Sequence, residues 1–143
     1  MTTYLLVHGA WGGAQTWRTV RPLLWAAGHP VFTPSLTGIG ERAHLTSPQI
    51  SLSTHVDDVV ATIHFEGLDD IVLVGFSYGG MVATGALDAI GDRIRELVYL
   101  DAFVPADGQS VFDLVGRAAP AGITDDWSIE FRTHTNPEIS RIP

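Results

Sequence analysis

Residues 69–80, DDIVLVGFSYGG, join a continuous apolar run to a sharp glycine-rich turn. The run from Ile71 to Val74 does not alternate with polar residues and is rich in β-branched side chains, which is typical of strands covered on both faces. The turn leads into a segment whose apolar residues recur at helical spacing as far as Ile90. This part of the sequence therefore predicts a buried strand, a tight turn and an amphipathic helix in immediate succession.

The chain on either side repeats this alternation of strand-like runs and helical periodicity. We expect strands over residues 4–7, 30–34, 69–75 and 96–101, and helices over 16–27, from Ser51 or Ser53 to Gly67, and over 81–90. The first helix is predicted from apolar residues that recur at three- and four-residue steps, namely Trp17, Val20, Leu23, Leu24 and Ala27. A polar loop over 35–50 and a short helix over 110–117 complete the pattern. Strands that alternate with helices predict an α/β domain with a parallel sheet and helices on both faces.

The composition excludes several classes of protein. The 143 residues are 45% hydrophobic and 17% charged, which is typical of one globular domain and excludes disorder, collagen and coiled coil. All basic residues are arginines, and the formal charge of -8 argues against a nucleic-acid partner. The chain has no cysteine, no signal-peptide pattern and no apolar run of the roughly 18 residues that a membrane span needs. We therefore expect a soluble, cytoplasmic protein that binds no membrane.

The pentapeptide G-x-S-x-G spans Gly75 to Gly79, at the end of the predicted buried strand. Its small residues let the chain reverse tightly, so that Ser77 would be held in a strained conformation at the carboxyl end of the strand. Ser77 would also lie at a helix N-terminus, where backbone N–H groups and the helix dipole favour a developing negative charge. The pattern predicts a nucleophilic serine; the alternative is a glycine-rich turn in which Ser77 only caps the helix.

A second glycine-rich turn, HGAWGG over residues 8–13, follows the first predicted strand. If that strand lies beside the one ending at Gly75, both turns meet at one edge of the sheet. The backbone N–H groups of Ala10 and Tyr78 would then point at one site. Two such donors can stabilise the oxyanion of an acyl-transfer reaction, each contributing about 10²-fold to 10³-fold in rate. The alternative is that these glycines serve packing alone.

Together these features resemble the α/β-hydrolase fold. The resemblance covers about residues 3–118 and rests on the first strand with its turn, on the serine turn up to Gly80, and on the strand that closes at Asp101. Within the fold, the chain is similar to small bacterial hydrolases related to plant methyl esterases and hydroxynitrile lyases. The resemblance implies that Ser77 is the nucleophile, that Ala10 and Tyr78 form the oxyanion hole, and that a helical cap begins after Asp101. It assigns residues 1–118 to the N-terminal part of the core with the start of its cap, and 119–143 to an irregular tail or cap remnant.

The resemblance stops short of a complete catalytic triad. Members of the family continue into further strands whose loops carry an acidic residue and then a histidine, so the chain looks like the front half of such an enzyme. Within the chain, Asp101 could be the acid, since it ends the strand after the serine, unless it only caps a loop. The chain order Ser, Asp, His leaves His134 as the candidate base, with a solvated role in a polar tail as the alternative.

The other candidate residues have simpler interpretations. Trp11 and Phe76 could wall an apolar substrate pocket, unless they belong to the core. We expect His8 to be structural, and His55 and His64 to lie on a solvated helix face. No metal site and no cofactor is predicted, because the polar residues around His55 do not converge as a helical metal motif would.

Three functions remain open. The first is a carboxylic-ester hydrolase that uses Ser77 on a small-molecule ester. The second, a hydroxynitrile lyase, loses support because the resembling enzymes use a lysine and this chain has none. The third is a catalytically incomplete domain, which would act as a binding module or be a truncated product. In that case the fourth strand presents an unpaired sheet edge, and we expect a homodimer or larger species.

Overall fold

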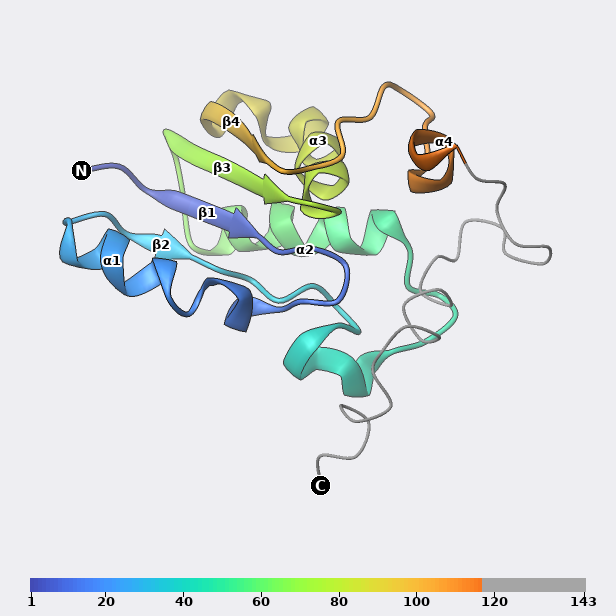
Figure 1. Ribbon diagram of the computed structural model, residues 1–143. Helices are drawn as coiled ribbons and strands as arrows, with labels where there is room; N and C mark the ends of the chain where they lie inside the picture. The colour runs from blue at the N-terminus through green and yellow to red at the C-terminus, as the bar shows by residue number, and fades with distance from the viewer. Residues whose placement is uncertain (117–143) are drawn as a thin grey trace.

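The computed structural model describes residues 1–116 and shows a four-stranded parallel sheet with flanking helices (Figure 1). The strands lie in the order β2-β1-β3-β4, with bounds β1 (Tyr4–Val7), β2 (Val31–Phe32), β3 (Ile71–Phe76) and β4 (Ile94–Leu100). The helices are α1 (Val20–Ala26), α2 (Leu52–Phe65), α3 (Gly79–Ile90) and α4 (Val111–Val115), with 3-10 turns η1 (Ala14–Trp17), η2 (Gly40–Leu45) and η3 (Gly91–Arg93). The predicted α/β class with a parallel sheet is confirmed.

The register of the sheet brings the carboxyl ends of three strands together. Val7 in β1 lies opposite Gly75 in β3, and Phe76 in β3 lies opposite Leu100 in β4. The segments that follow these strands therefore leave the sheet at the same edge, which is where parallel α/β folds place their ligand sites. The two glycine-rich turns lie next to each other at this edge, as predicted.

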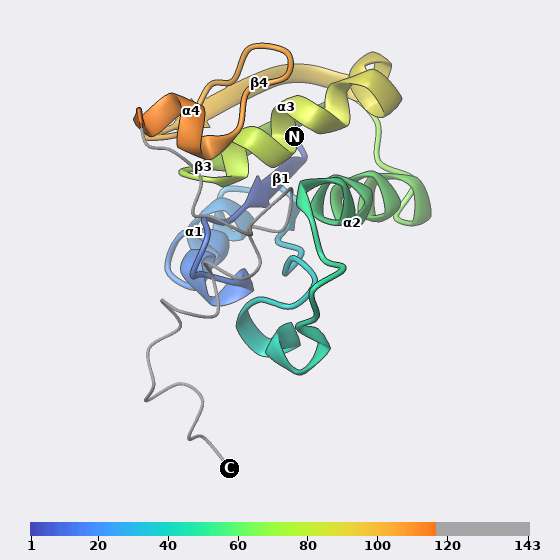
Figure 2. The same ribbon diagram turned by 90° about the vertical axis from the view of Figure 1, so that its right-hand side faces the viewer.

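Alternate side chains of β1 and β3 point to opposite faces of the sheet, and each face has its own core. Leu5 and Leu73 belong to the larger core, which α2 and α3 complete with the buried residues Val59, Ile63, Met81, Val82, Ala83, Ala86 and Ile90. Leu6 and Val74 belong to a smaller core on the other face, where Trp17 is buried with them. Figure 2 shows α1 on one side of β1 and α2 on the other.

The first helix is shorter than predicted, and several of its apolar residues are exposed. Residues 14–17 form a 3-10 turn, and the α-helix starts only at Val20. Trp17 is buried and Leu24 packs against the smaller core, but Leu23 is 67% exposed. Val20 and Ala27, which belong to the same periodic set, are exposed as well. The physical reason is that the seven-residue α1 packs against the two-residue strand β2, which can cover few of its side chains.

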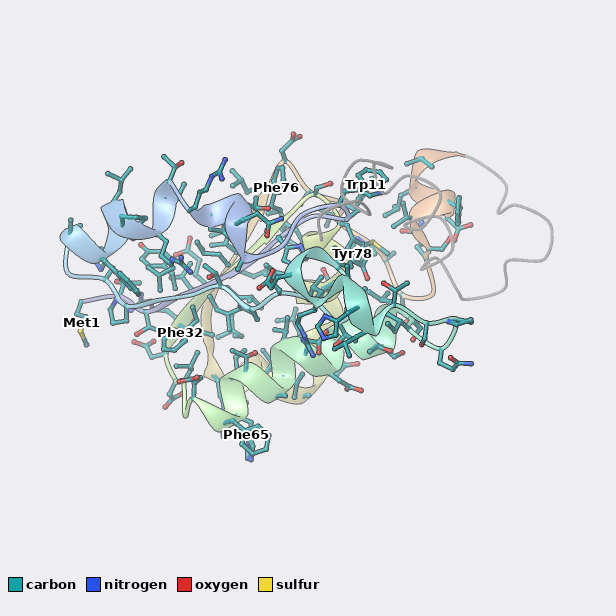
Figure 3. All side chains as sticks on the ribbon, turned by 90° about the horizontal axis from the view of Figure 1, so that it is seen from below. Met1, Trp11, Phe32, Phe65, Phe76 and Tyr78 are labelled. Carbon is teal, nitrogen blue, oxygen red and sulfur yellow. The ribbon has the colours of Figure 1, made fainter. Side chains whose placement is uncertain are left out.

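The bounds and the N-cap of the second helix agree with their prediction. Ser51 is the N-cap, and its backbone N–H donates a hydrogen bond to Oγ1 of Thr54 at 3.1 Å. Gly67 follows the last turn with φ of 62°, a left-handed conformation that glycine adopts without strain. Phe65, at the end of α2, points away from the body of the molecule (Figure 3) and is 86% exposed.

Candidate active site

Ser77 occupies the junction between β3 and α3 in a left-handed conformation, with φ of 53°. This conformation is costly for a residue with a side chain and is maintained here by hydrogen bonds on both sides of the residue. The Ser77 N–H donates to the carbonyl of Leu100 at 3.4 Å, and the Ser77 carbonyl accepts from the N–H groups of Gly80 at 3.0 Å and Phe103 at 3.1 Å. The predicted strained serine turn is therefore present.

Two glycines make this turn sterically possible. A Cβ on Gly75 would lie 2.6 Å from the carbonyl oxygen of Gly79, so strand and helix could not approach each other as they do. A Cβ on Gly79 would collide with the carbonyl oxygen of Val7 and lie 2.8 Å from that of His8. The G-x-S-x-G spacing thus allows α3 to start directly against the end of β1.

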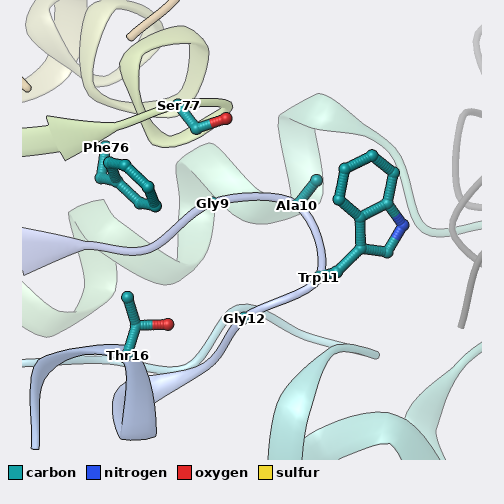
Figure 4. Close-up of a pocket in the computed structure, with 7 residues that line it drawn as sticks. All are labelled: Gly9, Ala10, Trp11, Gly12, Thr16, Phe76 and Ser77. Carbon is teal, nitrogen blue, oxygen red and sulfur yellow. The ribbon is translucent and has the colours of Figure 1, made fainter. Parts of the chain in front are cut away.

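The turn after β1 lies over Ser77 and forms a pocket with it. A Cβ on Gly9 would be only 3.1 Å from Cβ of Ser77, which shows how closely the two turns approach. A pocket of about 260 Å³ is lined by Gly9, Ala10, Trp11, Gly12, Thr16, Phe76 and Ser77 (Figure 4). Its side-chain walls are mainly apolar, and the structure brings Ser77, Ala10, Trp11 and Phe76 together around it.

The side chain of His8 stabilises the glycine-rich turn by hydrogen bonds. Its ring is fully buried, Nδ1 lies 2.7 Å from the carbonyl oxygen of Gly9, and Nε2 accepts the N–H of Leu36 at 3.0 Å. Because Nε2 accepts a hydrogen bond, the proton of the neutral ring is on Nδ1, which donates a hydrogen bond to the carbonyl oxygen of Gly9. Burial lowers the pKa of His8 below its ordinary value, which favours this neutral form. The structural role predicted for His8 agrees with this geometry.

Two further hydrogen bonds hold the far end of the same turn in place. The Ala14 N–H donates to Oγ of Ser35 at 2.7 Å, and that hydroxyl donates to Oε1 of Glu41 at 2.6 Å. The hydrogen bond from Ser35 lowers the pKa of Glu41, so the carboxylate remains ionised and accepting. The polar loop over 35–50 therefore serves to anchor the turn that carries Ala10.

Asp101 lies immediately beyond β4, in register with Ser77 beyond β3, and its φ of 45° is also left-handed. It is exposed. His134 lies outside the described residues, so its distance from Ser77 is not defined.

Among residues 1–116, no three His, Cys, Asp or Glu side chains gather as a metal site would require. No helix in that range is long and apolar enough to cross a membrane.

The expectation that His55 is solvated is wrong, because its ring is only 1% exposed. Nδ1 lies 2.9 Å from the hydroxyl oxygen of Tyr78, and Nε2 lies 2.8 Å from the carbonyl oxygen of Thr37. The sequence contains a signal for this burial that the polar neighbours obscured. His55 precedes the core residues Val59 and Ile63 by four and eight positions, which places all three on one helix face.

Known proteins resemble the chain in both sequence and structure. A profile of the Alpha/beta hydrolase family matches residues 4–141. A carbendazim hydrolyzing esterase from Nocardioides sp. is 50% identical over 124 residues, which are 87% of this chain and 51% of that protein. Methylesterase 8 from Arabidopsis thaliana is 30% identical, over 97% of this chain and 56% of the relative.

Among solved structures, an extracellular alpha/beta-hydrolase from a Paenibacillus species superposes with a TM-score of 0.74 at 35% identity. The match covers 79% of this chain and 46% of that structure. The chain thus spans about half the length of the relatives it matches. The family profile, the parallel sheet and the resemblance to methyl esterases lead to one assignment: the chain belongs to the α/β-hydrolase family.

Proposed function

We propose that the chain is the nucleophile-bearing part of a serine hydrolase that acts on carboxylic esters. The observation that carries the proposal is the left-handed Ser77 at the β3–α3 junction, in the wall of a pocket that it shares with Ala10 and Trp11. Strain held at one residue by its surroundings is characteristic of functional positions. The esterase names of two relatives support the same reaction class.

In this reaction Oγ of Ser77 attacks the acyl carbon of the ester while a histidine takes its proton. The carbonyl oxygen becomes an oxyanion, which the backbone N–H groups of Ala10 and Tyr78 stabilise. The tetrahedral intermediate then collapses, the C–O bond of the leaving group breaks, and the alcohol leaves with the proton returned by the histidine. Water attacks the acyl-serine in the same way, which releases the acid and restores Ser77.

The proton acceptor is not one of the buried histidines. Both ring nitrogens of His8 and of His55 already make hydrogen bonds, and each of these rings supports a backbone segment. His134 is our candidate for the base, with Asp101 as the acid that orients it. The second candidate function is a catalytically incomplete domain, which the hydrogen bonds at both ring nitrogens of His8 and of His55 favour.

The pocket suggests the size and character of the substrate. With Trp11 and Phe76 as walls and a volume of about 260 Å³, it suits a small ester with an apolar acyl or alcohol group. Simple methyl and p-nitrophenyl esters are therefore the first substrates to test, together with carbendazim itself because of the relative that hydrolyses it.

The test compares hydrolysis of p-nitrophenyl acetate by the parent chain, Ser77→Ala and His134→Ala. Matched controls are Ser53→Ala and His64→Ala, which alter exposed residues on α2. We expect Ser77→Ala to lower kcat/KM by at least about 10³-fold. Mass spectrometry under acid quench should show an acetyl group on Ser77 in the parent and none in the variant.

The three outcomes separate the two functions. If His134→Ala falls together with Ser77→Ala, the chain carries its own base. If only Ser77→Ala abolishes a weak rate, the domain is incomplete and the base belongs to residues that this chain lacks. A parent rate equal to that of Ser77→Ala, with no acetyl-serine, would refute Ser77 as the nucleophile.

A further inference from the structure

A buried polar chain links helix α2 to the residue that follows Ser77. His55 on α2 and Tyr78 at the start of α3 are each 1% exposed, and their rings meet edge to face with centroids 5.8 Å apart. Figure 3 shows the Tyr78 ring within the molecule, in contrast with Phe65 at the far end of α2. The Nδ1–Oη distance of 2.9 Å is that of a hydrogen bond between the two side chains.

The direction of this hydrogen bond follows from the other side of the ring. The carbonyl oxygen of Thr37 can only accept, so Nε2 of His55 carries the proton that it donates over 2.8 Å. In the neutral ring Nδ1 is then unprotonated, and it accepts the hydroxyl proton of Tyr78. Burial lowers the pKa of His55 and raises that of Tyr78, so both groups keep the neutral forms that this arrangement needs.

The carbonyl oxygen of Thr37, which accepts the hydrogen bond from His55, is itself held in place by its neighbours. Asp58 accepts the Thr37 N–H at 2.6 Å on Oδ2 and the Thr37 hydroxyl at 2.8 Å on Oδ1. Arg42 donates to the same Asp58 oxygen at 3.4 Å and to the carbonyl oxygen of Ser35 at 3.0 Å. Both ring nitrogens of His55 are therefore held by hydrogen bonds, one to Thr37 in the loop that Asp58 holds in place and one to the Tyr78 side chain.

Tyr78 connects these hydrogen bonds to the candidate active site. Its backbone N–H is one of the two proposed oxyanion donors, and its backbone directly follows the strained Ser77. Its side chain is anchored at the far end by His55, so the residue is restrained both along the backbone and through the ring. We propose that His55 is a positioning residue, which holds the Tyr78 ring and thereby sets the orientation of the Tyr78 N–H and of Ser77.

This inference rests on the proposed function, since it concerns the same site. A purely structural role for His55 would also satisfy the buried Tyr78 hydroxyl, but it would affect stability without a selective effect on the chemical step. The test therefore needs measurements that a change in stability alone does not alter. These are the separate effects on kcat and KM and the amide signals of the serine turn.

Four substitutions separate the two hydrogen bonds of the ring. His55→Phe removes both, and Tyr78→Phe removes only the hydroxyl. His55→Asn places an amide oxygen near the position of Nδ1 and keeps an acceptor for Tyr78, whereas His55→Gln keeps a donor for Thr37 and loses that acceptor. His64→Phe, on the exposed side of the same helix, is the matched control.

We expect His55→Phe, His55→Gln and Tyr78→Phe to lower kcat by about 10-fold to 100-fold with KM nearly unchanged, because a misplaced donor weakens transition-state binding. The double variant His55→Phe/Tyr78→Phe should be no slower than the single variants, since both break one interaction. His55→Asn should restore most of kcat. His64→Phe should stay within about twofold of the parent.

Nitrogen-15 NMR of the full chain supplies readouts that need no turnover. The parent should show the Nε2–H tautomer of His55, and the Ser77 and Tyr78 amide signals should move in His55→Gln and Tyr78→Phe but not in His64→Phe. The Nδ1–H tautomer, or amide signals unchanged by both variants, would overturn the proposal even if His55→Phe fails to fold. A parent without Ser77-dependent turnover would refute the proposed function, and these NMR results would still decide the role of His55.

Discussion

Left-handed backbone conformations mark the candidate site at the scale of single residues. Among residues 1–116, the non-glycine residues with positive φ are Asp70, Ser77 and Asp101. Ser77 and Asp101 follow adjacent strands at the same edge of the sheet, whereas Asp70 precedes β3 at the opposite end. Each such conformation costs about 1–3 kcal/mol, so two of them side by side require firm support from neighbouring contacts. For Ser77 that support comes from its backbone hydrogen bonds with Leu100 and Phe103.

Buried histidines give the stability of the chain a predictable pH dependence. Burial lowers the folded-state pKa of His8 and of His55 below the ordinary value of 6.5, so the unfolded chain binds these protons first as the pH falls. Stability is therefore complete above pH 6.5 and is lost as the pH falls from there toward the lower folded-state pKa values. Each histidine contributes a slope of at most about 1.4 kcal/mol per pH unit in that window.

Urea unfolding at pH 7.5, 6.5 and 5.5 measures this slope, and His8→Asn should flatten it while His64→Asn, which alters an exposed ring, should not. His8→Asn also lowers stability at every pH, so the comparison concerns the change with pH and not the absolute value. Equal slopes for the parent and His8→Asn would contradict the proton uptake assigned to His8.

Close contact between elements depends on glycine at the start of α3. A methyl group at Gly79 would collide with the end of β1, whereas one at Gly91 would meet no atom within 4 Å. Gly79 is the first residue of α3, and Gly91, its C-cap, has φ of -58° and ψ of -31°, which are helical angles. Alanine should therefore improve helix propensity at either position, and the difference between the variants isolates the steric conflict.

We predict that Gly79→Ala lowers the free energy of unfolding by about 1–3 kcal/mol, because the α3–β1 contact must open. Gly91→Ala should leave it unchanged or raise it by up to about 1 kcal/mol. Thermal and urea unfolding of the two variants provide the measurement. If Gly79→Ala were as stable as Gly91→Ala, the close approach of α3 to β1 would not constrain the fold.

Elements with strong local patterns were predictable from the sequence, and those that depend on distant contacts were not. The apolar run of β3, the caps of α2 and the G-x-S-x-G turn are local features, and the structure contains each of them. The burial of His55 depends on the loop that presents Thr37 and on Tyr78, which are far from it in sequence. The exposure of α1 likewise depends on the short length of β2, which periodicity within α1 cannot reveal.

The sheet of residues 1–116 has two unequal faces, and β4 lies at one of its edges. The larger core fills the space under α2 and α3, while the smaller core contains five buried residues. Within residues 1–116, the seven-residue strand β4 pairs with β3 on one side, and no other strand of this range lies along its outer edge. Such an edge is a template for pairing with another chain.

We therefore propose that copies of this chain associate through β4, and that light scattering at micromolar concentration gives a mass of two or more chains. Leu100→Lys places a charge at the end of β4, where Leu100 is 47% exposed, and should shift the mass toward the monomer because lysine opposes edge pairing. Leu23→Lys is the matched control on α1, where Leu23 is 67% exposed, and should leave the mass unchanged. A sharp monomer peak for the parent would contradict the association, and a loss of association in Leu23→Lys alone would place the contact on α1 instead of β4.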